Sequence, residues 1–254
     1  MSLDTHRCLD AIAGHSAALA DAAEGHLDAP VAHCPGWAVA DLVHHVTSVQ
    51  WFWAWVAHNR PSAFPESLKR PERVPDEDLV AALRRTTDTL VGTLADADQS
   101  APCWTWSPGR QHVGFITRHQ VQEAAVHHWD AADAAGQDAA IADDVAADAI
   151  EEFLDCSVAS ETAPLSAEQA VGVQPLGGRL VLHAAPGRAW TVTDAVTPGA
   201  LAWERGETAP ATGTVQGTPG ELLLWLYERV ELPVETVPSA DDLVARFRAH
   251  TFTD

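Results

Sequence analysis

Stretches with helical periodicity fill the first 160 residues and limit what this chain can fold into. Apolar residues recur there at three- and four-residue steps, and Pro-rich segments such as HLDAPVAHCPG and RPSAFPESLKRPERVP interrupt them. The pattern predicts helices at about residues 4–27, 38–58, 76–97, 113–135 and 142–159. Helices of this length bury their apolar faces against one another, so we expect a helical bundle in which the long second break forms a crossover.

The pattern changes after about residue 165. The run GRLVLHAAPGRAWTVTDAVTPGALAWERG contains short β-favouring segments between Gly and Pro, which predicts a small sheet. The segment TPGELLLWLYERV predicts a helix with Thr218 as its N-cap, and SADDLVARFRAH predicts another. We therefore expect an α+β chain with two domains, a helical bundle over residues 1–162 and a small α/β domain over residues 163–254.

The composition excludes several classes of partner. The 36 acidic and 15 basic residues give a formal net charge of -21, which repels phosphate backbones and anionic lipid, so we expect no nucleic acid and no membrane partner. The four cysteines form no CxxC pair, which argues against a disulfide framework or a zinc knuckle. The N-terminus MSLDTHRCLD has no hydrophobic signal core, and we expect a cytoplasmic monomer or homodimer.

Two predicted helices carry the residues with the clearest chemical pattern. In QEAAVHHWDAA, Glu123 and His127 lie one helical turn apart, so both side chains can reach one cation, although the same spacing also occurs on solvated surfaces. In VADLVHHVTSVQWFWAWV, His45 lies inside an apolar stripe that includes Leu42 and Val49. Its neighbour His44 is rotated by about 100° and is expected to be the more exposed of the two.

A buried His45 needs a polar partner, and two kinds of partner stay open. A backbone carbonyl or a hydroxyl is one, and a metal ion is the other. Two imidazoles and one carboxylate suit zinc and leave one coordination position free, as in the metal centres of helical bundles. His119 precedes His127 by about 12 Å of helix axis, too far for both to join Glu123 on one ion, and we interpret His128 as a packing or surface residue.

Two motifs in these helices resemble a known family. CPGWAVADLVHHV and QEAAVHHWDAADAAG are similar to the mycothiol-dependent maleylpyruvate isomerase family of the DinB-like metal-binding superfamily, and the C-terminal third resembles that family's α/β domain. The resemblance implies an N-terminal DinB-like four-helix bundle with up-down order and a divalent metal, preferably zinc, on His45, Glu123 and His127. It also matches Arg229 to an arginine of the family's C-terminal domain, which implies a clamp for substrate or thiol.

The resemblance also implies an activity. Mycothiol would be the cosubstrate, and its thiolate would attack a small electrophile, which is then isomerised or conjugated. The residues themselves leave two other functions open: hydrolysis by a metal-bound water, or a non-enzymatic small-molecule binding or resistance protein. The tryptophans of the first domain either line a pocket or pack in its core, and they are Trp37, Trp51, Trp53, Trp55, Trp104 and Trp106.

Overall fold

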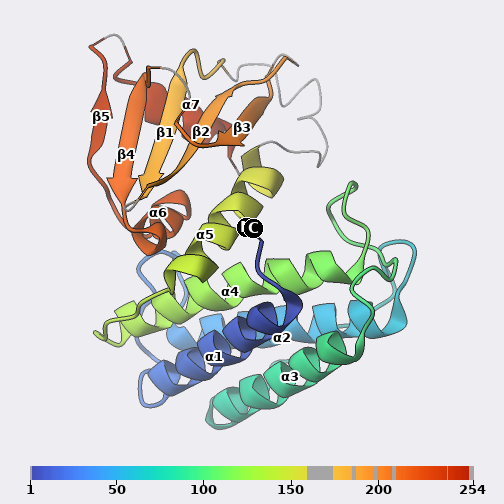
Figure 1. Cartoon of the computed structure of the whole chain (residues 1–254). Coiled ribbons are helices and arrows are strands. Elements are labelled where there is room, and N and C mark those ends of the chain that lie inside the picture. Colours follow the sequence, from blue (N-terminus) through green and yellow to red (C-terminus); the bar gives the residue numbers. More distant parts are fainter. Residues whose placement is uncertain are drawn as a thin grey trace. The chain divides into compact units, whose positions relative to one another are not determined.

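The computed structural model describes residues 2–158, 174–184, 187–196, 199–207, 210–238 and 240–251. These residues form an α+β protein, which confirms the predicted fold class (Figure 1). The chain divides into two compact units, Met1–Trp106 with Arg110–Ile141, and Ser107–Gly109 with Ala142–Asp254. None of the described helices is both long enough and apolar enough to cross a membrane.

The described part of the first unit contains four long helices. They are α1 (Thr5–Ala23), α2 (Val39–Asn59), α3 (Asp76–Asp96) and α4 (Val113–Ala134), and their ends lie within a few residues of the predicted ones. Helices α3 and α4 each pack against both α1 and α2, as Figure 1 shows. All four contribute to one apolar core, for example through Leu19, Val46, Leu83 and Ala131.

The long segment between α2 and α3 is fastened to α2 by two arginines. The Arg73 guanidinium donates to Asp41 on α2 at 2.5 Å and to Asp76 at the start of α3 at 2.9 Å. The Arg70 guanidinium donates to the Ser48 hydroxyl at 3.2 Å. The segment is therefore held along one side of α2, although most of its residues are exposed.

A mixed sheet forms the centre of the second unit. Its strands are β1 (Arg179–Ala184), β2 (Arg188–Asp194), β3 (Leu201–Arg205), β4 (Gly213–Gly217) and β5 (Val234–Thr236). They lie in the order β3-β2-β1-β4-β5, with β1 and β4 parallel and the other neighbours antiparallel. Around them are α5 (Asp143–Phe153), the π-helical turn Leu154–Val158, α6 (Pro219–Leu226) and α7 (Leu243–His250).

The start of α6 confirms the predicted capping box. The Glu221 backbone N–H donates to the Thr218 hydroxyl at 3.2 Å, and the Thr218 backbone N–H donates to the Glu221 carboxylate at 2.8 Å. Pro219 occupies the first helical turn, where its missing N–H costs nothing. Local sequence therefore determines where this helix begins.

Helix α5 belongs to the second unit, whereas the sequence analysis assigned it to the first. The reason lies in Glu151, whose carboxylate accepts hydrogen bonds from the Trp190 indole at 3.2 Å and from the Arg205 Nε at 2.6 Å. Both donors lie on strands, so α5 is fastened to the sheet. Residues 162 and 163, between which the sequence analysis placed the boundary, lie outside the described residues. The two compact units divide between Ile141 and Ala142 instead.

The Glu151 contacts predict a pH-dependent contribution to stability. Burial raises the pKa of this carboxyl, but the hydrogen bonds from Arg205 and Trp190 together hold it below its ordinary value. An unperturbed glutamate in the unfolded chain has a pKa of about 4.3. Because the pKa of Glu151 is lower in the folded state, Glu151 adds to the free energy of unfolding above that pH. This stabilisation is lost as the pH falls through the folded-state pKa. At pH 7, Glu151→Gln should lower the thermal midpoint by a few degrees, which calorimetry can measure.

Glu235 on β5 is exposed, so Glu235→Gln is the matched control and should leave the thermal midpoint unchanged. Equal midpoints for Glu151→Gln and wild type would contradict this account of how α5 is attached.

Candidate metal centre

A tight turn before α2 places an indole ring against the first candidate ligand. The Trp37 backbone N–H donates to the Cys34 carbonyl at 3.0 Å, and Gly36 between them has φ +87°, a conformation that L side chains rarely adopt. Pro35 and Gly36 thus occupy the two central positions as a type II turn requires. The Trp37 and His45 ring centroids lie 5.0 Å apart, so the CPGW motif acts as a support for His45.

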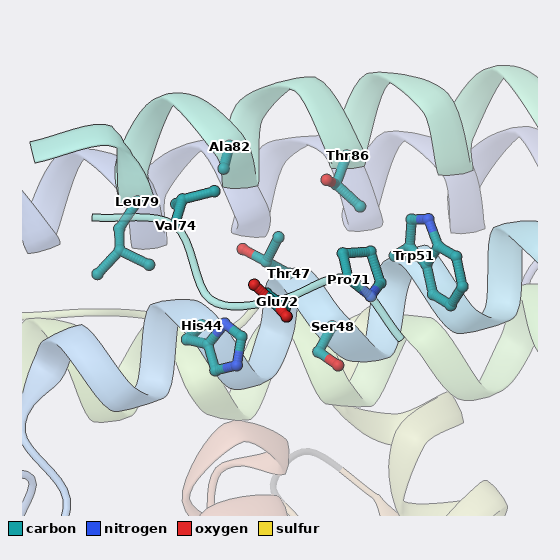
Figure 2. A pocket seen from close by; sticks show the side chains of 10 residues that line it. All are labelled: His44, Thr47, Ser48, Trp51, Pro71, Glu72, Val74, Leu79, Ala82 and Thr86. Carbon is teal, nitrogen blue, oxygen red and sulfur yellow. The ribbon is translucent and has the colours of Figure 1, made fainter. Parts of the chain in front are cut away.

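His44 and His45 have different surroundings although they are adjacent on α2. His44 lines a cavity of about 120 Å³ between α2, α3 and the preceding segment, and Figure 2 shows it near Glu72 and Leu79. His45 instead faces α4, where its ring lies 5.1 Å from that of His127. Both histidines are half-buried, and the segment between α2 and α3 lies beside His44.

The three predicted ligands come together between α2 and α4. One ligand atom from each of His45, Glu123 and His127 lies within 4.8 Å of the other two, and no other such group of His, Cys, Asp and Glu exists among the described residues. The Glu123 Oε2 lies 4.0 Å from the His45 Nε2 and 3.5 Å from the His127 Nε2. Tetrahedral zinc with bonds of about 2.1 Å separates its ligand atoms by about 3.4 Å. The donor set and its spacing therefore fit a zinc ion.

A buried carboxylate orients one of these imidazoles. The His127 Nδ1 lies 3.0 Å from the Asp130 Oδ2, and the Asp130 side chain is fully buried. An imidazole that donates its Nδ1–H to a carboxylate keeps the Nε2 lone pair for a metal, and Nε2 is the atom that faces Glu123. Sequence reasoning missed Asp130, although its position three residues after His127 in HHWD is a detectable signal.

Electrostatics keep His45 in the form that a metal binds. Burial lowers its pKa to about 4, and the charges of His127, Arg70 and His44 act in the same direction. The imidazole is therefore neutral at pH 7 with a lone pair available. The Glu123 side chain is only 10 % exposed, and a carboxylate with so little solvent requires a nearby positive charge or hydrogen bonds.

Two further histidines of α4, His119 and His128, pack against other side chains. His119 is buried, and its ring lies 5.2 Å from that of Trp106, 5.5 Å from that of Phe115 and 6.2 Å from that of Trp53. The His128 Nδ1 lies 3.0 Å from the His15 Nδ1 on α1. The contact of His128 agrees with its interpretation as a packing or surface residue.

The tryptophans divide between the two roles that the sequence left open. Trp53 is buried and stacks on Trp104 at 6.1 Å, so it belongs to the core. Trp51 lines the small cavity beside His44, and Trp37 lies against His45 (Figure 2). Only Trp37 of these touches a candidate ligand, so the aromatic content of this unit serves packing above all.

Arg229 lies in the second unit, just after α6. It is half-buried, and its Nη1 donates to the Tyr227 carbonyl at 2.7 Å. Its role as a clamp for substrate or thiol stays a prediction.

Comparison with known proteins relates the first unit to a known family. Residues 8–132 match the family of mycothiol maleylpyruvate isomerase N-terminal domains. A crystal structure of a mycothiol-dependent maleylpyruvate isomerase is similar with a TM-score of 0.58 and 13% identity, over 93% of this chain and 95% of that chain. A variant of that isomerase with one histidine replaced by alanine gives a TM-score of 0.59 at 12% identity over the same shares. No curated protein matches the chain.

The geometry predicts which substitutions abolish metal binding. Protein purified without added metal should contain about one zinc per chain by elemental analysis, and Glu123→Gln and His45→Ala should each lose it, because each removes one of three ligand atoms. Asp130→Asn should retain zinc but bind it about 10- to 100-fold more weakly. His44→Ala is the matched control and should keep the wild-type zinc content, since His44 lies outside the ligand group. Full zinc retention in His45→Ala would refute this ligand assignment.

The buried histidines predict how stability depends on pH. Burial lowers the pKa of His15 to about 4, and the charges of His128 and Arg7 act in the same direction. In the unfolded chain the same imidazole has its ordinary pKa of about 6.5. Between pH 6.5 and 4 the unfolded state therefore binds more protons, and the free energy of unfolding of metal-free protein should fall as the pH falls. His15→Asn keeps a polar atom but cannot titrate, so denaturant unfolding should show a shallower pH dependence. An equal slope of unfolding free energy against pH in His15→Asn and wild type would contradict this role of His15.

Proposed function

Residues 8–132 belong to the family of mycothiol maleylpyruvate isomerase N-terminal domains, and from this premise we propose that the protein is a metal-dependent enzyme that uses mycothiol to isomerise or conjugate a small electrophile. The observation that carries the proposal is the convergence of His45, Glu123 and His127 within 4.8 Å. We also infer that α1 to α4 form a DinB-like four-helix bundle with up-down order. Such bundles build metal centres from side chains on facing helices, as α2 and α4 do in this chain.

Each residue of the group has a distinct task. His45 supplies a neutral imidazole, because burial keeps its pKa at about 4. Glu123 supplies the negative charge, and Asp130 fixes the tautomer of His127 so that Nε2 faces the other two ligand atoms. A divalent cation held by these three side chains would supply a Lewis acid with a free position, which favours the thiolate form of a thiol at neutral pH.

The thiol chemistry then accounts for both proposed reactions. A thiolate that adds to an activated double bond of the substrate converts it to a single bond, about which the substrate can rotate. Loss of the thiolate restores the double bond with the opposite geometry, which is an isomerisation and returns the thiol unchanged. If the adduct takes up a proton instead, the product is a conjugate and the thiol is consumed.

Three further features support a small substrate and a reduced thiol, one in each unit and one in the cysteines. The Trp37 indole shields one side of His45. Arg229 is the proposed cation for an acidic substrate, which an otherwise strongly acidic chain needs. The four cysteines form no disulfide, which agrees with our proposal of a reducing cytoplasm as the location.

Thiol dependence separates this proposal from the alternatives. Zinc-loaded protein should convert an electrophilic cis-dienoic or maleyl-type acid only when thiol is added, with isomer and conjugate distinguished by chromatography and mass spectrometry. Glu123→Gln should reduce the rate at least 100-fold, whereas the neighbouring His44→Ala should stay within a few-fold of wild type.

Turnover of ester or amide substrates without any thiol would indicate a hydrolase that uses metal-bound water. Tight ligand binding without product, unchanged when the metal is removed, would indicate a binding protein instead.

A further inference from the structure

Gln120 is a buried amide whose hydrogen-bonding groups are not used by the fold. The residue is 1 % exposed, and neither its Oε1 nor its Nε2 has a hydrogen-bond partner among the residues that the structure describes. Buried polar side chains in native proteins are nearly always hydrogen-bonded, so an exception calls for an explanation. A ligand that binds beside the side chain is one such explanation.

The position of Gln120 on α4 points to the candidate metal centre. It precedes Glu123 by three residues and His127 by seven, so the three side chains share one face of the helix. Gln120 and Glu123 are three residues apart, which is about 4.5 Å along the helix axis. A ligand with one group at the ligand atoms of Glu123 and His127 therefore needs only a short extension to reach Gln120.

A second buried glutamine, Gln50, has hydrogen bonds within the fold for both of its polar groups. The Gln50 Nε2 donates to the Ser16 hydroxyl at 2.8 Å, and its Oε1 accepts from the Thr87 hydroxyl at 2.7 Å. Gln50 thereby joins α1, α2 and α3, and its exposure of 2 % matches that of Gln120. Gln50 is thus a matched control for Gln120, with the same side chain and burial but with both polar atoms paired.

We propose that the Gln120 carboxamide binds an amide group of the thiol cosubstrate, next to its sulfur. This inference rests on the proposed function. A carboxamide presents both a donor and an acceptor, as an amide does, whereas a carboxylate presents only acceptors and would be repelled by Glu123 one turn away. In a cysteine-type thiol the nearest amide nitrogen lies about 3–4 Å from the sulfur, which matches a spacing of one helical turn. Gln120 thus selects amide-bearing thiols over simple alkyl thiols.

Binding of two small thiols to zinc-loaded protein tests this selection. N-acetylcysteamine carries an uncharged amide, and 1-pentanethiol has a chain of the same length without it. By calorimetric titration, Gln120→Met should weaken N-acetylcysteamine about five- to tenfold, the worth of one or two hydrogen bonds, and leave 1-pentanethiol unchanged or slightly tighter. If the variant and the wild type show the same ratio of affinities for the two thiols, the inference is wrong and the proposed function stands. If neither thiol binds the zinc-loaded wild type, the proposed function fails together with it.

Thermal unfolding of the metal-free protein supplies a readout that does not depend on the thiol. Gln120→Met should raise the midpoint by a degree or more, because an apolar side chain of similar size replaces an unsatisfied amide. Gln50→Met should lower it by several degrees, because two hydroxyl partners lose their hydrogen bonds. A decrease for Gln120→Met as large as that for Gln50→Met would show that Gln120 has a structural partner, and would overturn the inference.

Discussion

The carboxylate of Glu123 between two imidazoles is the interaction on which this account depends. It joins α2 to α4, since His45 comes from one helix and Glu123 and His127 from the other. A carboxylate that is 10 % exposed beside the neutral His45 imidazole is costly unless positive charge or hydrogen bonds compensate it. A divalent cation would supply that charge and satisfy all three ligand atoms at once, and Asp130 behind His127 extends the arrangement into the core.

Other features of the first unit hold this group in place. The Cys34–Trp37 turn sets the Trp37 ring against His45, and Arg73 links the segment before α3 to Asp41 in the first turn of α2. These contacts fix the rotation of α2, so that His45 faces α4 while His44 faces the cavity toward α3 (Figure 2). A site on rigid helices needs such support, because small errors in ligand position weaken metal binding.

Much of this arrangement could be predicted from the sequence because its signals are local. Helical periodicity located α1 to α4, the Thr218 and Glu221 pair located the start of α6, and one apolar stripe identified the inward histidine. What escaped prediction depends on long-range contacts. The sequence of α5 alone predicts one more helix of the bundle. Its attachment to the sheet depends on hydrogen bonds between Glu151 and the side chains of Trp190 and Arg205, which lie 39 and 54 residues later on the chain. The path of the segment that lines the cavity beside His44 is likewise not specified by the sequence.

X-ray absorption at the zinc edge, recorded on zinc-loaded protein with and without added thiol, tests the central claim most directly. Before the thiol is added, we expect only nitrogen and oxygen ligands, with a signal from two imidazoles. After the addition, we expect one sulfur at about 2.3 Å. Sulfur in the zinc environment of the thiol-free protein would place the metal on cysteines and contradict the His45, Glu123 and His127 site. A spectrum that the thiol does not change would contradict the proposal that the free position accepts a thiolate.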